Sequence, residues 1–392
     1  MKSESELRGD GENVQRPTSN AHSGTPEAIS HLYVHVPFCA RICPYCAFYK
    51  TLADNSQTRR FCEALLREVE DLAQRFLIRP ETIFLGGGTP TALNTELLEF
   101  LLTGFRQRLD LSMLREWTVE ANPGSVSPRK AQLLRKAGVN RVSLGVQSWD
   151  NELLKLLGRE HDAAQAESSF RILQQADFPS VSLDLMFGLP GQTLSQWERD
   201  LARTISLRPQ HISTYCLTYE EDTEFFLRHS RGEFREDPES DAQFLERAMA
   251  MLEEAGYRHY EISNYALPNF ESAHNRGYWA GDDYLGIGPS AFSTVGADRW
   301  QNVCDYRAYA DAVLTGASAV GSTETLTPGM KRTERIALAL RTRDGIPVRE
   351  LEGSQTESDE FLKLGLLTET DGNFVLTRRG KLLADSVAEA FI

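Results

Sequence analysis

A sixfold alternation of strand-like and helix-like runs between residues 31 and 217 constrains the fold of this chain more than any other feature. The strand candidates are residues 31–38, 82–87, 117–122, 141–148, 180–188 and 211–217. The helix candidates between them are residues 58–76, about 94–108, 128–138, 163–177 and 195–207. Short connections between such units favour a parallel sheet covered by helices, and right-handed crossovers curl six strands into an open, partial (β/α)6 barrel. An eight-stranded barrel is the alternative, but only six units precede Thr218, where the pattern breaks.

The residues before and after the alternation predict a tail and an extension of the barrel. Residues 1–29 are polar and lack the apolar core of a secretion signal, so we expect a disordered tail there. Residues 30–220 then form the barrel itself. Residues 221–324 extend it, with an added strand at 257–266 and an aromatic loop at 274–293.

A small α+β domain is expected at the C-terminus, over residues 325–392. Its helix candidates lie near residues 328–341, 347–352 and 358–365. A hairpin turning at Asp371-Gly372 and a last helix follow them. This order is similar to that of a winged helix, a fold often associated with DNA, although a fold alone does not confer a function.

Charge and cysteine usage exclude several classes of protein. The net charge of −14 argues against nucleic acid as the main partner, because phosphate binding needs a positive face. No run of about 18 apolar residues exists, so we expect no transmembrane helix. Three of the six cysteines, Cys62, Cys216 and Cys304, are scattered. They form no disulfide framework, which favours the reducing cytoplasm as the compartment.

The other three cysteines, Cys39, Cys43 and Cys46, form a C-x3-C-x2-C group after the first strand. Soft thiolates select zinc, copper(I) or iron–sulfur clusters. Three thiolates cannot complete a four-coordinate structural zinc site, but they can hold three irons of a 4Fe–4S cube and leave the fourth open. The alternatives are a zinc knuckle and three incidental thiols.

Further candidate ligand-binding residues follow or end the later strands. The run Gly86-Gly87-Gly88-Thr89-Pro90 follows the second strand, and its glycines let the backbone approach a ligand closely. Glu120 and Gln147 end the third and fourth strands, Arg159 lies just beyond, and Asp184 lies inside the fifth. Because the carboxyl ends of parallel barrel strands meet at one rim, these residues predict a ligand site. Solvated loops and strand-end salt bridges are the structural alternative.

These motifs resemble those of the radical S-adenosylmethionine (SAM) superfamily. In combination, residues 33–46, GGGTPT, VEANPG, RVSLGVQS, DLMFGLPGQT and ISNYA resemble the oxygen-independent coproporphyrinogen III oxidase group, over roughly residues 30–390. The resemblance implies a radical SAM partial barrel with a 4Fe–4S cluster on Cys39, Cys43 and Cys46, whose open iron binds SAM. It also implies SAM-site positions at Tyr33, Gly87, Gly88, Thr89, Glu120, Gln147, Arg159 and Asp184.

Two branches of that group are separated by two features. The oxidative enzymes have another cysteine two residues after the last cluster ligand, where this chain has Phe48, and a longer N-terminal extension. The HemW-type haem chaperones have an HNRxYW motif, which is intact here at residues 274–279. The chain is therefore similar to the chaperone branch.

The motif HNRGYW has a chemistry of its own that suits haem. The imidazole of His274 can ligate haem iron, Arg276 can pair with a propionate, and Tyr278 and Trp279 offer flat faces. The structural alternative is that Asn275 and Arg276 brace a loop while the two aromatic residues pack. We expect a haem chaperone that binds haem, SAM and a 4Fe–4S cluster, with an unknown acceptor haemoprotein as partner. A coproporphyrinogen III dehydrogenase and a radical SAM enzyme on an unrelated substrate are the alternatives.

Overall fold

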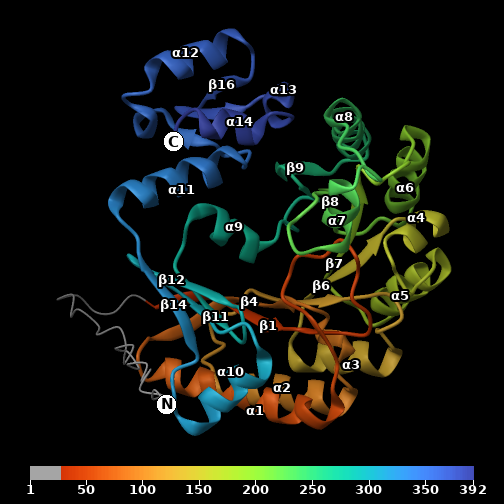
Figure 1. Cartoon of the computed structure of the whole chain (residues 1–392), viewed down its shortest axis with the longest axis vertical. Helices are drawn as coiled ribbons and strands as arrows, with labels where there is room; N and C mark the ends of the chain where they lie inside the picture. Colours follow the sequence, from red (N-terminus) through yellow and green to blue (C-terminus); the bar gives the residue numbers. More distant parts are fainter. Residues whose placement is uncertain (1–27) are drawn as a thin grey trace, which may run out of the picture.

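The computed structural model describes residues 28–392, so nearly all of the tail predicted at residues 1–29 lies outside the described residues. All six predicted strands of the barrel are confirmed. They are β1 (Ile29–Val36), β4 (Ile78–Gly87), β5 (Glu116–Ala121), β6 (Arg141–Gln147), β7 (Ser180–Phe187) and β8 (His211–Cys216). These strands are neighbours in this order, and every pair is parallel. The expected partial (β/α)6 barrel is therefore the core of the molecule (Figure 1).

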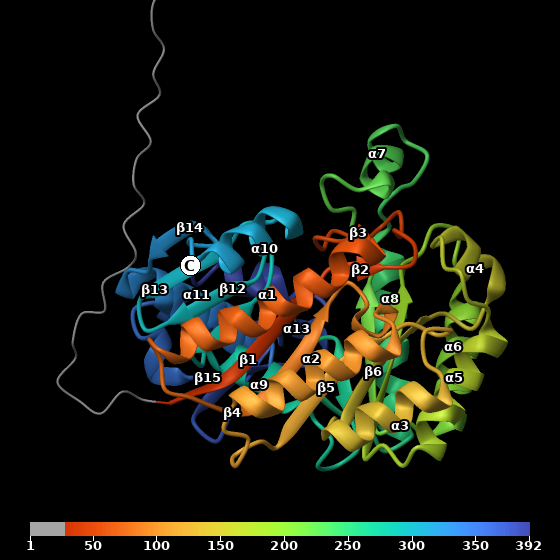
Figure 2. The same ribbon diagram turned by 90° about the horizontal axis from the view of Figure 1, so that it is seen from below.

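The five predicted helices cover the outer face of these strands, as Figure 2 shows for the first three. They are α1 (Asn55–Ala73), α2 (Thr95–Arg108), α3 (Pro128–Ala137), α5 (Ala163–Gln175) and α6 (Leu194–Leu207). The signals at the ends of α3 act as expected, because the Ser127 side chain caps its first turn and Gly138 ends it at a φ of 105°. A short helix, α4 (Asn151–Leu156), was not predicted.

The alternation along each strand divides the barrel into an apolar outside and a polar inside. On β1 the side chains of Leu32, Val34 and Val36 are fully buried in the core under the helices. Tyr33 and His35 have the opposite register and bond to each other. Since side chains alternate across a strand, they face the concave side. The polar interior is therefore where a ligand can bind.

The extension over residues 221–324 adds strands to both edges of the sheet. Its elements are α7 (Glu224–Ser230), α8 (Pro238–Glu254), β9 (Arg258–Glu261), β10 (Asn264–Ala266), α9 (Ala273–Ala280), β11 (Tyr284–Ile287), β12 (Phe292–Val295), β13 (Asp298–Asn302), α10 (Tyr306–Thr315) and β14 (Val320–Thr325). The single strand predicted at residues 257–266 is two strands, of which β10 pairs with β8 and β9 pairs with β10. At the other edge β11 lies parallel to β1, and β12, β13 and β14 continue the sheet.

The prediction of a loop over residues 274–293 is wrong, because HNRGYW lies in the helix α9 and the second half contains β11 and the start of β12. The Ser272 hydroxyl accepts a hydrogen bond from Asn275 N at the start of α9, and Gly281 ends it at a φ of 76°. Buried Glu116 on β5 accepts hydrogen bonds from the first two backbone N–H groups, those of Ala273 (2.8 Å) and His274 (3.1 Å). A carboxylate at a helix N-terminus is stabilising, so Glu116 fixes α9 against the barrel.

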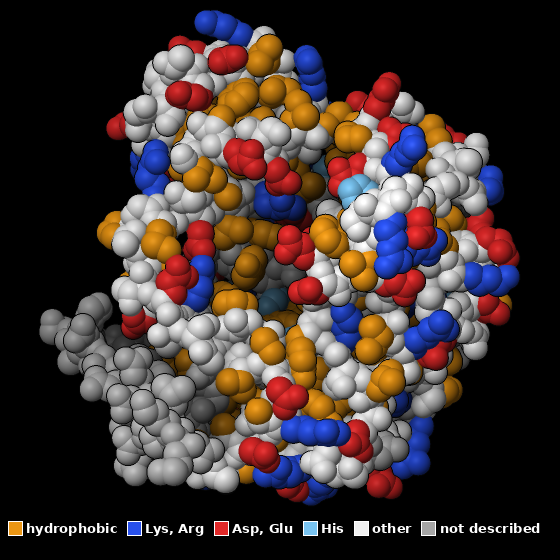
Figure 3. Space-filling model, in the orientation of Figure 1, with side chains coloured by type: hydrophobic (Ala, Val, Ile, Leu, Met, Phe, Trp, Pro, Cys, Tyr) orange, Lys and Arg blue, Asp and Glu red, His pale blue; other side chains and the backbone are white. Residues whose placement is uncertain are grey.

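The C-terminal module has the predicted winged-helix order. It consists of α11 (Pro328–Leu340), β15 (Ile346–Pro347), the short 3-10 helix η2 (Val348–Leu351), α12 (Gln355–Lys363), β16 (Leu367–Thr370), β17 (Asn373–Leu376), α13 (Arg378–Lys381) and α14 (Ala384–Glu389). Its strands form an antiparallel sheet in the order β15-β17-β16, and the hairpin turns at Asp371-Gly372 as expected. The module has its own apolar core and stands beyond α9 in Figure 1. Figure 3 shows a hollow between it and the barrel. No helix in residues 28–392 is long and apolar enough to cross a membrane.

A buried carboxylate, Glu68 on α1, joins the barrel to its extension. Glu68 accepts hydrogen bonds from Gly288 N (2.8 Å), from Asn302 Nδ2 (2.7 Å) and from the Tyr309 hydroxyl. Burial raises the pKa of Glu68 to about 7, although these three hydrogen bonds oppose the shift. The contact is therefore sensitive to pH near neutrality.

This arrangement predicts that Glu68 makes the protein less stable as the pH rises. The pKa of Glu68 is higher in the folded state than in the unfolded state. The stability that protonated Glu68 contributes is therefore complete below the ordinary pKa of a glutamate and is lost as the pH rises through about 7. The loss amounts to about 2.5 kcal/mol between pH 5 and pH 8. The measurement is the free energy of unfolding of the parent and of Glu68→Gln across this range. The amide N–H of Glu68→Gln faces another hydrogen-bond donor, which destabilises the variant by the same amount at every pH. The comparison is therefore between the slopes of unfolding free energy against pH, not between the absolute free energies. Equal slopes would contradict the assignment.

Candidate functional site

Cys39 ends the short strand β2 (Phe38–Cys39), and Cys43 and Cys46 lie in the loop between it and its partner β3 (Thr51–Leu52). Cys39 Sγ lies 3.7 Å from Thr89 Oγ1, and Cys46 N donates to Cys43 O at 3.3 Å. Burial raises the pKa of the Cys39 thiol, and the thiols of Cys46 and Cys43 raise it further. All three are free and partly exposed.

Within residues 28–392 no three His, Cys, Asp or Glu side chains are gathered closely enough to hold a single metal ion. In a 4Fe–4S cube each cysteine would bind a different iron. The raised pKa of Cys39 and Cys46 keeps these thiols protonated at neutral pH, so binding of iron must release protons.

The glycine run at the end of β4 lies against the cysteine loop. Gly88 N donates to Val36 O at 2.9 Å, and a Cβ at this position would lie 2.5 Å from the carbonyl carbon of Pro37. Gly87 has a φ of 96°, and a Cβ there would lie 2.4 Å from the His35 ring. Both positions therefore require glycine. Gly87 N donates to Glu120 Oε2 at 3.2 Å, which joins the run to the end of β5.

Arg159 connects the cysteine loop with the ends of β5 and β6. Its Nη1 lies 3.6 Å from Cys43 Sγ, and its Nη2 donates to Asn122 Oδ1 (2.5 Å) and Gly145 O (2.7 Å). Asn122 Nδ2 in turn donates to Thr89 Oγ1 at 2.7 Å. Our sequence reasoning did not single out Asn122, although its position just after a strand was the same signal that selected Glu120.

Glu120 and Asp184 place two acidic groups inside the barrel beneath this rim. Asp184 accepts hydrogen bonds from the hydroxyls of Ser143 (2.8 Å) and Ser182 (2.9 Å). Burial, and then the charge of Asp184, raises the pKa of Glu120 to about 8, and burial also raises the pKa of Asp184. Within residues 28–392 neither carboxyl group forms an ion pair, although the charge of Arg141 opposes both pKa shifts. Two such carboxyl groups inside the barrel suit a cationic or hydrogen-bond-donating ligand.

Tyr33 and Gln147 complete the predicted set. The Tyr33 hydroxyl lies 3.1 Å from His35 Nδ1, and its ring stacks on Phe84 at 6.2 Å. Burial, followed by the charge of Glu120, raises the pKa of Tyr33. Gln147 ends β6 at a φ of 69°, in the left-handed region that non-glycine residues rarely adopt. The structure thus places the predicted SAM residues on neighbouring strands of one concave face, next to the cysteines.

His274 is separate from this rim and lies near the start of the strands. Its Nδ1 is 2.8 Å from Thr82 Oγ1, and its ring stacks on Phe84 at 5.1 Å. Burial, and then His31 and Arg141, lower the pKa of His274 to about 3, so the imidazole is neutral. A neutral imidazole is the form that binds metal ions.

The Thr82 hydroxyl lies between two imidazoles. Its oxygen is 2.8 Å from Nδ1 of His31 and 2.8 Å from Nδ1 of His274. Because Nδ1 of His274 faces Thr82, Nε2 is the ring nitrogen that points away from this contact.

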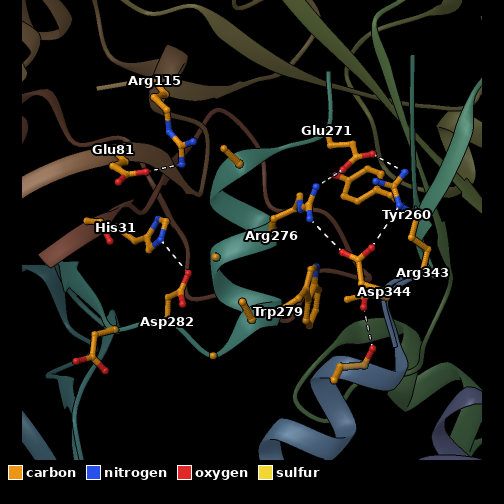
Figure 4. Close-up of a pocket in the computed structure, with 18 of the residues that line it drawn as sticks. His31, Glu81, Arg115, Tyr260, Glu271, Arg276, Trp279, Asp282, Arg343 and Asp344 are labelled. Carbon is orange, nitrogen blue, oxygen red and sulfur yellow. Dashed lines mark hydrogen bonds and ion pairs between the residues drawn. The ribbon is translucent and has the colours of Figure 1, made fainter. Parts of the chain in front are cut away.

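Arg276, Gly277 and Trp279 of the motif line a polar cavity of about 1080 Å³ between the barrel and the C-terminal module (Figure 4). Arg276 pairs with Glu271 (2.8 Å) and Asp344 (3.1 Å), and Arg343 bonds the same two carboxylates. Trp279 lines this cavity, and Arg341 lies 5.4 Å from its ring centre. Arg276 therefore holds the C-terminal module against α9. This contact favours the structural alternative for Arg276, in which the residue braces the fold.

Comparisons with known proteins agree on one family. The profile of the radical SAM superfamily matches residues 33–203. The "Heme chaperone HemW" of Lactococcus lactis is 36% identical over 370 residues, covering 92% of this chain and 96% of the relative. The protein of that name from Bacillus subtilis is 35% identical, covering 92% and 98%. The solved structure of coproporphyrinogen III oxidase (HemN) from Escherichia coli matches with a TM-score of 0.80 at 23% identity, over 93% of this chain and 90% of that one. This last likeness concerns the fold alone.

Proposed function

The chain belongs to the HemW family of the radical SAM superfamily, and on this premise we propose that it is a haem chaperone. It binds a 4Fe–4S cluster, SAM and haem in the cytoplasm and passes the haem to an acceptor haemoprotein. The observation that supports this proposal most is the placement of HNRGYW. The motif forms a capped helix between the barrel and the C-terminal module, rather than a strand of the SAM rim.

The cofactor residues divide into two groups by their contacts. Cys39, Cys43 and Cys46 hold the cluster, and a bound cluster supplies an open iron for the amino and carboxylate groups of SAM. Arg159 is placed to pair with a carboxylate, since its planar fork bonds two oxygens. The remaining SAM contacts come from the rim residues Tyr33, Gly87, Gly88, Thr89, Glu120, Gln147 and Asp184.

A coproporphyrinogen III dehydrogenase is the alternative, and Phe48 argues against it. Phe48 occupies the position of the extra cysteine of the oxidative branch, and its side chain is 67% exposed in the cysteine loop. The deciding experiment uses anaerobically reconstituted full-length protein. One assay follows haem uptake and transfer to an apo-haemoprotein, and the other follows coproporphyrinogen III with SAM and a reductant. Haem transfer without turnover supports the chaperone, whereas many turnovers to protoporphyrinogen would establish the dehydrogenase.

The axial ligand of the haem is proposed to be His274, through Nε2. Ligation requires that an iron reach this atom from the concave side or that the ring leave Thr82. We expect His274→Ala to weaken haem binding and to shift the Soret band, while cluster content and SAM affinity stay at parental levels. Arg276→Ala should weaken binding less, because its contacts in this structure are carboxylates of the protein. An unchanged affinity and spectrum in His274→Ala would show that the ligand lies elsewhere.

A further inference from the structure

A second cavity, of about 930 Å³, lies beside α9 between the edge of the large sheet and the C-terminal module. We call it the aromatic groove. Its lining comes mainly from α9, β11, β12, β13, α11 and η2, and Figure 1 shows α9 between α11 and β12. It adjoins the polar cavity of Figure 4, and Ala280, Gly281, Asp282 and Arg335 line both.

One wall of the groove is aromatic. Tyr278 and Phe292 are 46% and 44% exposed, and the ring of Tyr284 lies 5.7 Å from that of Tyr278. Exposed aromatic side chains that cluster in a groove mark binding sites, because burying their apolar surface against a ligand is favourable. Flat faces of this kind pack against flat, apolar ring systems.

Charged side chains line the rest of the groove, where five cations face four carboxylates, those of Asp282, Glu334, Glu350 and Glu352. Among the cations, Arg299 pairs with Glu334 and Arg335 pairs with Glu350. The other three are Lys331, Arg332 and Arg349. Among residues 28–392 none of these three is within ion-pair distance of a carboxylate; Lys331 and Arg332 instead donate to the backbone oxygens of Gly296 (2.6 Å) and Glu350 (2.9 Å). Such cations are available to an anionic ligand.

We propose that the aromatic groove is the porphyrin-binding site. The porphyrin ring lies on the aromatic wall, and its two propionates point toward Lys331, Arg332 and Arg349. This inference rests on the proposed haem-chaperone function and adds the place and orientation of the ligand. A flat, apolar dianion fits a cavity that joins exposed rings to unpaired cations. His274 lies one helical turn before Tyr278 on α9 but does not line the groove, so its ligation of a porphyrin stacked on Tyr278 requires the ring to leave Thr82.

The test compares two groove variants with two matched controls, all as the full chain. Phe292→Ser removes an exposed ring from the groove, and Met113→Ser removes a side chain of similar exposure (55%) elsewhere. Arg332→Glu with Arg349→Glu reverses two groove charges, and Arg129→Glu reverses an exposed charge on α3. The probe is hemin, titrated to a Soret endpoint at low and at high salt. Thermal unfolding and cluster content show that each variant is folded.

We expect Phe292→Ser to weaken hemin binding about tenfold at both salt concentrations. The double charge reversal should weaken it at least tenfold at low salt and less at high salt, because salt screens exposed charges. Both controls should bind like the parent. If the parent binds hemin and the groove variants bind it equally well, the porphyrin lies elsewhere and only this inference is overturned. If the parent binds no hemin, the proposed function itself fails. If the groove variants change only the sedimentation of the protein, the groove is an interface between copies of the chain, and the inference is likewise overturned.

Discussion

Replacing Cys39, Cys43 or Cys46 by Ala is expected to abolish assembly of the 4Fe–4S cluster. Each thiolate binds a different iron of the cube, and the fourth iron is reserved for SAM, so no protein ligand is left over. The structure gives each thiol a place in one loop, with Cys39 beside Thr89 and Cys43 beside Arg159. Iron and acid-labile sulfide per chain after anaerobic reconstitution measure the result, together with the visible spectrum of the cluster.

The matched control for these variants is Cys304→Ala. Cys304 is also a free thiol with an exposed side chain, and it lies outside the loop, near Ser290. This variant should reconstitute like the parent. Full iron and sulfide content in the triple variant of Cys39, Cys43 and Cys46 would refute cluster ligation by this loop.

Arg159→Ala and Asp184→Ala are expected to lower SAM affinity at least tenfold. Removing one partner of an enclosed, hydrogen-bonded charge pair costs about 2–5 kcal/mol, much of it because the other charge is left unpaired. Arg159 approaches Cys43 from the SAM rim, and Asp184 is held by two serine hydroxyls inside the barrel. Isothermal titration of reconstituted protein with SAM measures the affinity.

The control for the SAM variants is Arg135→Ala. Arg135 is a partly buried arginine of α3 that donates to Val139 O at 3.0 Å, on the outer layer of helices. Its loss removes a cation and a hydrogen bond of similar kind but should leave SAM affinity unchanged. Parental affinity in both Arg159→Ala and Asp184→Ala would show that SAM does not bind at this rim. Because Arg159 also contacts Cys43, cluster content is measured in the same samples.

The sequence by itself determined the barrel and the position of its candidate ligands. Each barrel strand is a local run of apolar residues, and the caps at Ser127 and Gly138 are local signals, so both could be identified without the fold. The cysteine spacing and the GGGTP run are likewise local. Parallel strands then bring Gly87, Glu120 and Arg159 to one face, as predicted. The similarity to the HemW-type chaperones was also visible in the motifs and is confirmed by the relatives.

The environment of HNRGYW was decided only by the tertiary structure. The motif was expected to be a loop, because a short helix has a weak periodic signal, although Ser272 and Gly281 were usable as end signals. The helix α9 is instead stabilised by Glu116, which comes from a strand more than 150 residues earlier in the chain. The strands β11–β14 were missed for the same reason, since β11 is four residues long and pairs with β1 across about 250 residues. The aromatic groove joins β11 and β12 to the C-terminal module, so no local pattern could reveal it. Contacts between distant segments depend on how the chain packs as a whole, and a sequence pattern reports only what neighbouring residues prefer.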